Sequence, residues 1–353
     1  MILTGLLIAS LTLSAVPLVS LWRAPVGAAL VERGPDGLDR VLARELVRHA
    51  TPAQVAARLD ALLAEAPRNW LAIEAVEEIA AERALPLPDD LIAQREAAWE
   101  QDSGLWLGAT KCARCMWSAA ECELSALLIC RAPVDLTPVG DIAGVIRGGS
   151  NYALGREVDQ VEVILSAIGL GAVGLALVTG GSSLTIKAGA GFAKTAKSMN
   201  RLPEALTTPL TRAFREGVDW ARIGSVRTAD DLTRLMRPEV LRPAVAILDD
   251  TGRLTRNTSV LAGLHLMKHV DSPKDMAALA RASDALGPRT VGTLEILGKS
   301  RVLRATMRLA DEVWSLVAGL AGMLAALVGL FWSALTSAVL RRLRRAARDP
   351  HRA

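Results

Sequence analysis

Four cysteines are the residues whose type and spacing most directly suggest chemistry. They fall within nineteen residues and are the only cysteines of the chain: Cys112, Cys115, Cys122 and Cys130. Clustered, even-numbered cysteines form disulfides in an oxidising compartment and metal or redox sites in a reducing one. Only the first pair has the short spacing of a zinc knuckle, no histidine lies nearby, and no βαβ pattern accompanies a redox pair. We therefore expect disulfides, with zinc, free structural thiols and a redox pair as alternatives.

The pairing of these cysteines stays open. If Met116 to Ile129 forms a helix, Cys115 and Cys122 share one face but lie about 10 Å apart along the axis, too far for a bond. A bond from Cys130, beyond that helix, back to Cys112 or to Cys115 is geometrically easier. The residues do not distinguish these two.

A pair of histidines, His265 and His269, would share one face of a helix in the sequence His-Leu-Met-Lys-His. The zinc protease pattern H-E-x-x-H needs a glutamate beside the first histidine as general base, and Leu266 occupies that position. We interpret the pair as partly exposed and without a ligand, with adventitious metal binding as the alternative. The four histidines of the chain support no catalytic triad, so we expect no enzyme, no catalytic residue, no cofactor and no resident metal.

Three glycines, Gly169, Gly171 and Gly174, match the dinucleotide-binding pattern G-x-G-x-x-G. That fold requires an acidic residue about twenty positions later to hold the ribose. No acidic residue occurs between Gly174 and Arg201, and no alternating strands follow. Glycines in an apolar helix are typical of closely packed helices, so we predict helix packing here and no nucleotide site.

The elements that must position these residues begin with the two ends of the chain. The run from Val313 to Leu340 contains no charge and exceeds the roughly 30 Å hydrocarbon layer, which predicts a transmembrane helix over 312–340. A basic tail follows at 341–353, and arginines collect on the cytoplasmic flank of membrane spans. The residues that fix this orientation are Arg341, Arg342, Arg344 and Arg345.

The first segment, 1–22, is almost uninterrupted apolar sequence ending at Trp22. We predict an N-terminal transmembrane anchor. A cleaved signal peptide is the alternative, although a basic n-region and a clear A-x-A-like cleavage site are both missing. In either case the residues after it are expected to cross the membrane.

A glycine-rich apolar stretch occupies 161–198, with Gly180 and Gly181 near its middle. A single crossing here, combined with an N-terminus inside, would leave the arginine tail outside. We expect a helical hairpin or surface-lying pair that turns at Gly180 and Gly181. Three spans with the N-terminus outside are the alternative, favoured by the arginines after residue 22, whereas the cysteines favour the hairpin.

Two regions have the pattern of soluble helices. In 23–105, Thr51-Pro52 predicts a helix start, and the helix from Trp70 is similar to the start of a tetratricopeptide-like pair, without a second copy. In 199–311, Ser272-Pro273-Lys274-Asp275 predicts another helix start, and Asp249-Asp250-Thr251-Gly252 predicts a turn. Between these regions, 106–160 combines the cysteines with Gly and Asp turns.

The segment 136–170 resembles the pre-toxin segment of bacterial polymorphic toxins. The resemblance rests on Pro138, Gly140 and Asp141, the Gly148-Gly149 turn, Gly155 and the apolar helix after Asp159. It covers about one tenth of the chain, and no toxin domain follows. A basic residue common before this helix in the family is replaced by Val161-Glu162. The resemblance implies a helical hairpin and an association with toxins.

The whole chain is therefore expected to be all-α, a membrane-anchored helical bundle with terminal transmembrane helices and a Gly-rich helical hairpin. Its net charge of +4 is small for 353 residues, so we expect no nucleic-acid partner. We predict a non-enzymatic bacterial inner-membrane structural or interaction protein. Its body would be periplasmic, its C-terminus cytoplasmic, and its partners the lipid bilayer and another envelope protein. The alternative is a membrane-active or toxin-associated factor whose hairpin inserts into a bilayer.

Overall fold

The computed structural model describes residues 34–103, 141–172 and 183–307, with four isolated positions between 329 and 334. These ranges are helical, and the β structure within them is limited to an isolated antiparallel bridge between Val218 and Met236. The predicted all-α class is confirmed. The predicted anchors at 1–22 and 312–340, the arginine tail, the four cysteines and the Gly180-Gly181 turn lie outside the described residues.

Among the helices of the described ranges, none is both long and apolar enough to cross a membrane. The chain divides into two compact units, 1–41 together with 304–353, and 42–303. All helices between Pro52 and Leu297 belong to the second unit.

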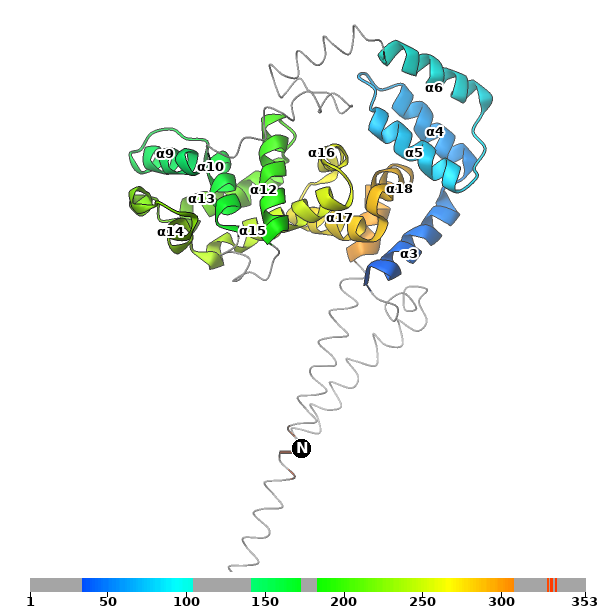
Figure 1. Cartoon of the computed structure of the whole chain (residues 1–353). Helices are drawn as coiled ribbons and strands as arrows, with labels where there is room; N and C mark the ends of the chain where they lie inside the picture. Colours follow the sequence, from blue (N-terminus) through cyan, green and yellow to red (C-terminus); the bar gives the residue numbers. More distant parts are fainter. Residues whose placement is uncertain are drawn as a thin grey trace, which may run out of the picture. The chain divides into compact units, whose positions relative to one another are not determined.

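The helices near the start of this second unit are α3 (Gly34–His49, which begins in the first unit), α4 (Pro52–Leu63), α5 (Trp70–Glu82) and α6 (Asp89–Asp102). The predicted start of α4 is confirmed, because the Thr51 side chain accepts a hydrogen bond from the Gln54 backbone N–H and Pro52 occupies the first turn. Buried aliphatic residues at helical spacing join α4 to α5, which pack side by side (Figure 1): Val55, Leu59, Leu62, Ile73, Val76 and Ile79.

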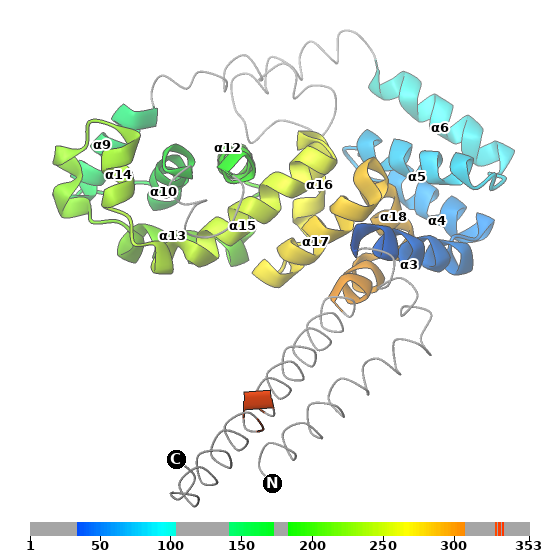
Figure 2. The ribbon, with the colours of Figure 1, turned by 60° about the horizontal axis from the view of Figure 1, so that its bottom comes forward.

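The middle of the unit contains α9 (Asp141–Ala153), α10 (Gln160–Leu170), α12 (Ser183–Ser198), α13 (Glu204–Gly217), η4 (Trp220–Ser225), α14 (Ala229–Arg234) and α15 (Pro238–Asn257). The long helix α15 contacts α12 and α13 (Figure 2). Its predicted interruption at Asp249-Asp250-Thr251-Gly252 is wrong, because the helix continues through these residues to Asn257. Burial of Thr251, Gly252 and Leu254 against neighbouring helices outweighs the local preference for a turn.

The two arms of the predicted 161–198 hairpin are the helices α10 and α12, which contact each other. Asp159 caps α10, as its side chain accepts a hydrogen bond from the Glu162 backbone N–H at 3.1 Å. The apolar residues of α10 are buried, with Ile164, Leu165 and Ile168 fully covered in a core shared with α12, α13 and α15. The apolar face of α10 is thus occupied by protein in this structure.

The helices after α15 are α16 (Val260–Leu266), η5 (Met267–His269), α17 (Pro273–Leu286), η6 (Gly287–Arg289) and α18 (Thr290–Leu297), and residues 299–307 are also helical. The predicted start of α17 is confirmed, with Ser272 as N-cap and Pro273 in the first turn. The Asp275 carboxylate accepts a hydrogen bond from the Asp271 backbone N–H. Helix α18 contacts α5 closely at Gly292, where an added Cβ would overlap the Ala75 carbonyl oxygen. Sequence-distant helices therefore meet where α4, α5 and α18 pack together.

Candidate functional site

The carboxylate of Glu295 is the centre of a buried polar cluster. Glu295 lies on α18, a helix whose other residues are buried and mostly apolar, and its side chain is 3% exposed. A buried carboxylate costs several kcal/mol unless charges and hydrogen bonds compensate it. The Glu295 carboxylate therefore needs hydrogen-bond donors or positive charges from the helices that pack against α18.

Three cationic or imidazole groups supply these partners. Arg58 of α4 donates from Nε to Glu295 Oε2 at 2.9 Å, and its Nη2 forms a second, short bond to the same oxygen. On the other oxygen, Oε1 accepts from Lys268 Nζ at 3.0 Å and lies 2.6 Å from His265 Nε2. Both carboxylate oxygens are thus fully occupied.

The local fold of α16 explains how one short segment delivers several groups to Glu295. Helix α16 ends at Leu266 and the chain continues directly into the 3-10 turn η5. His265, Lys268 and His269 of this continuous segment all approach Glu295. His269 Nε2 lies 3.9 Å from Glu295 Oε1, and the rings of His265 and His269 are 6.2 Å apart. His269 Nε2 is buried and has no hydrogen-bond partner.

The ring orientation of His265 is linked to the start of α5. Asn69 is the N-cap of α5, where its side-chain oxygen accepts from the Ala72 backbone N–H at 3.3 Å. In that orientation the Asn69 amide nitrogen donates to His265 Nδ1 at 2.5 Å. His265 is then the neutral tautomer that donates from Nε2 to Glu295.

The pKa values of His265 and Glu295 are both lowered, which agrees with a neutral imidazole beside an ionised carboxylate. Burial lowers the pKa of His265, against the opposing effect of the Glu295 hydrogen bond. Burial alone would raise the pKa of Glu295, but the hydrogen bond from His265 and the positive charge of Lys268 bring it well below its usual range. The cluster therefore pairs an ionised Glu295 with a neutral His265 near neutral pH.

Chemically, the cluster offers ligand atoms but no evident nucleophile. Among the described residues, His265, His269 and Glu295 form the one group whose ligand atoms, all within 4.8 Å of one another, could hold a metal ion. Two histidines and one carboxylate are a known zinc ligand set. Arg58 and Lys268 already balance the carboxylate, so the cluster also suffices as a structural connection between α4, α16 and α18.

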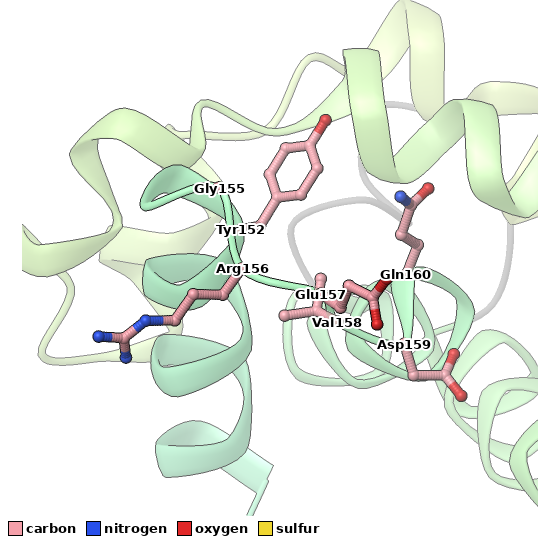
Figure 3. A pocket seen from close by; sticks show the side chains of 7 residues that line it. All are labelled: Tyr152, Gly155, Arg156, Glu157, Val158, Asp159 and Gln160. Carbon is pink, nitrogen blue, oxygen red and sulfur yellow. The ribbon is translucent and has the colours of Figure 1, made fainter.

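A second candidate is a surface pocket of about 630 Å³ beside the turn between α9 and α10 (Figure 3). All of its lining comes from one short stretch, 152–160, which includes Arg156, Glu157 and Asp159. The side chains of Arg156 and Asp159 point in opposite directions (Figure 3). Asp159 also pairs with Lys197 of α12. Because its polar groups do not converge, this pocket is a weaker candidate than the Glu295 cluster.

Two of the sequence-based expectations, for the histidine pair and for the glycine pattern, can be compared with the structure. The expectation of a partly exposed histidine pair is wrong for His265, which is 1% exposed, while His269 is partly exposed. In the glycine pattern, Gly169 lies within α10 and Gly171 is the C-cap of that helix. An added Cβ at Gly171 would meet the Met236 side chain, so this glycine allows close packing.

Glu295, Arg58 and Asn69 were not predicted from the sequence as partners of the histidines. The one signal that could have identified Glu295 is a single charge inside the apolar run Thr-Val-Gly-Thr-Leu-Glu-Ile-Leu. Arg58 and Asn69 carry no comparable signal. The cysteines, the Gly180-Gly181 turn and the C-terminal arginines lie outside the described residues, so the structure does not place them.

Comparison with protein families, curated proteins and solved structures finds no significant match to this chain.

Proposed function

We propose that the chain is a non-enzymatic structural or interaction protein of the bacterial inner membrane, whose helical body binds another envelope protein. The observation that carries this proposal is a pair of exposed large apolar side chains on one face of α6. Ile92 and Trp99 occur seven residues apart, on one face of the helix, and each is 42% exposed. Large apolar side chains at this spacing are typical of helix faces that receive a partner.

Trp99 is held in place by neighbouring side chains. Its ring lies edge-on to Trp70, with centroids 4.8 Å apart and planes at 80°. The Arg95 guanidinium lies 5.6 Å from the Trp70 ring and 5.8 Å from the Trp99 ring, and Arg95 Nε donates to Glu77 at 3.0 Å. A fixed aromatic side chain loses little conformational freedom on binding, which favours Trp99 as the anchor of an interface.

Site-specific photocrosslinking in the native cell tests this interface. We would replace Ile92 with the photoreactive residue p-benzoylphenylalanine and irradiate intact cells. A discrete crosslinked species from position 92 supports the proposal. Ala97 is the matched control, because it is exposed on another face of α6. Equal crosslinking from both positions, or none from position 92 in correctly localised protein, would contradict it.

The location of the body is proposed from the ends of the sequence. The apolar segments 1–22 and 312–340 and the arginines from Arg341 support an anchored chain with its C-terminus in the cytoplasm. The grouped cysteines support an oxidising compartment for the body. Labelling intact cells with a membrane-impermeant thiol reagent should modify Cys112 to Cys130 only after reduction. Modification that requires cell lysis would contradict the periplasmic location.

A further inference from the structure

We propose that His265, His269 and Glu295 form a binding site for a divalent transition-metal ion of the zinc class, which enters by displacing the ammonium of Lys268. The ligand atoms would be His265 Nε2, His269 Nε2 and Glu295 Oε1, with solvent at a fourth position. This inference goes beyond the proposed function and departs from the sequence-based expectation of no metal site.

The spacing of the ligand atoms is close to what a tetrahedral ion needs. Zinc bonds of about 2.0–2.1 Å at tetrahedral angles place neighbouring ligand atoms about 3.3 Å apart. Glu295 Oε1 lies 2.6 Å from His265 Nε2 and 3.9 Å from His269 Nε2, one value below and one above that separation. Side-chain movements of well under 1 Å would equalise these two distances. All three ligand atoms lie within 4.8 Å of one another, so the two imidazole rings would also close toward each other by up to about 1.5 Å.

The environment of His269 gives a second reason, separate from the ligand-atom distances, to expect a bound ion. Its Nε2 atom is buried, points toward the cluster and has no hydrogen-bond partner, although the other groups around Glu295 are all bonded. A buried polar atom left without a partner costs about 1–3 kcal/mol. An ion bonded to Nε2 would remove that penalty and would explain why a histidine occupies this position.

The hydrogen bond between Asn69 and His265 Nδ1 can adapt to metal binding through one amide rotation. A metal at Nε2 moves the ring proton to Nδ1, which then requires an acceptor. Rotation of the Asn69 amide places its oxygen against Nδ1, and the two ends of a side-chain amide are nearly alike in size. The Ala72 N–H keeps its bond to the Asn69 backbone carbonyl at 3.1 Å. The rotation gives up the side-chain N-cap bond to Ala72 and turns the amide nitrogen toward that N–H, but the Ala72 donor stays satisfied by the backbone carbonyl.

The charge of the cluster stays balanced when the metal enters. Lys268 contributes one positive charge at Glu295 Oε1, and its side chain is 42% exposed, so it can turn into solvent. A divalent ion carrying one hydroxide also contributes a single positive charge. Arg58 remains on Oε2, where it orients the carboxylate. Lys268 therefore competes with the metal for the same oxygen.

Cobalt titration of the purified full-length protein tests the proposal. After treatment with a chelator, we expect one equivalent of Co²⁺ to give the intense visible absorption of a four-coordinate site, and Zn²⁺ to displace it. His269→Ala should weaken binding at least about a hundredfold while circular dichroism stays unchanged, because His269 Nε2 makes no hydrogen bond that the fold would lose. His49→Ala, at a partly exposed histidine of α3 that lies outside the cluster, is the matched control and should bind as the unaltered protein does.

Lys268→Met provides a second, opposite test. Removing the competing ammonium should tighten Co²⁺ binding about tenfold or more. A purely structural ion cluster predicts no such gain. Three outcomes would overturn the proposal: absence of stoichiometric Co²⁺ binding, binding that His269→Ala leaves intact, or a thiolate-to-cobalt charge-transfer band showing that the cysteines alone hold the metal.

Discussion

Arg58 and Glu295 are 237 positions apart in the chain, yet Arg58 Nε lies 2.9 Å from Glu295 Oε2, on a carboxylate that is 3% exposed. This bond joins α4 near the start of the compact unit to α18 near its end. His265 approaches the other oxygen, Oε1, from α16. The cluster therefore holds together three segments that are far apart in the sequence.

Removing the carboxylate should destabilise the protein. Glu295→Ala removes the acceptor of the fully buried His265 and of Arg58 and Lys268. Because Arg58 and Lys268 are 30% and 42% exposed and can be hydrated, we expect a cost of about 1–3 kcal/mol, set by the unsatisfied buried donor. Urea denaturation should show a lower free energy of unfolding by that amount. Glu216→Ala serves as the control, because Glu216 pairs with Arg212 at 3.1 Å in an exposed position. That change should cost less than about 1 kcal/mol. Equal losses for the two variants would show that the Glu295 cluster contributes nothing special.

The contact between α12 and α15 depends on two glycines, one on each helix, that each lie against the backbone of the other helix. A Cβ added at Gly252 would overlap the Thr185 carbonyl oxygen, and one added at Gly189 would overlap the Leu248 carbonyl oxygen. Because backbone atoms cannot move aside as a side chain can, Gly252→Ala should lower the free energy of unfolding by about 1–3 kcal/mol or more. Thermal denaturation followed by circular dichroism measures this.

Gly191 is the matched control on α12. An added Cβ there meets nothing within 4 Å, and the residue is exposed. Gly191→Ala should therefore stabilise the protein by up to about 1 kcal/mol, since alanine favours the helix over glycine. If Gly191→Ala and Gly252→Ala shift the melting temperature in the same direction, the close approach of α12 and α15 is not as described.

Acidification should destabilise the protein through His265. Burial lowers the pKa of His265 in the folded state, whereas in the unfolded chain it has the ordinary value of about 6.5. The unfolded state therefore binds more protons as the pH falls below about 6.5, and its free energy drops relative to the folded state. The destabilisation due to His265 is absent above pH 6.5, and below it the free energy of unfolding can fall by about 1.4 kcal/mol per pH unit. Glu295, whose folded pKa is also lowered, loses its contribution only as the pH falls below about 4.3.

Urea denaturation at pH 7 and pH 5.5, with a chelator present, separates the effect of His265 from that of other groups. The free energy of unfolding should decrease between these values in the unaltered protein and in His49→Ala. His265→Gln should show a smaller decrease, even though it is less stable at pH 7. An unchanged slope in His265→Gln would assign the pH dependence to other residues.

The N-cap of α17 should contribute measurably to stability. The Ser272 side chain accepts a hydrogen bond from the Asp275 backbone N–H at 3.2 Å. Ser272→Ala removes this acceptor and should cost about 1 kcal/mol, whereas Ser272→Asp, which keeps an acceptor, should cost much less. Thermal denaturation of both variants tests this. Equal losses in the two variants would mean that the serine acts through something other than capping.

Local sequence signals predicted helix starts well. Thr51 and Ser272 are N-caps in the structure because their side-chain oxygens satisfy backbone donors within three residues. Such bonds need no information from the rest of the fold. The turn predicted around Asp249 and Gly252 was wrong, since α15 continues through both residues. There the contact of Gly252 with Thr185 of α12 decides the conformation, and a local pattern cannot encode that contact.

The sequence by itself determined the all-α class, the capped helix starts and the presence of two histidines on one short segment. It could not determine the Glu295 cluster, because Arg58, Asn69 and Glu295 belong to segments whose separations in the chain carry no periodic signal. Only packing of α4, α5, α16 and α18 brings these groups within hydrogen-bond distance. The physical reason is that a buried carboxylate requires partners from whichever helices surround it, and the tertiary structure alone selects those helices.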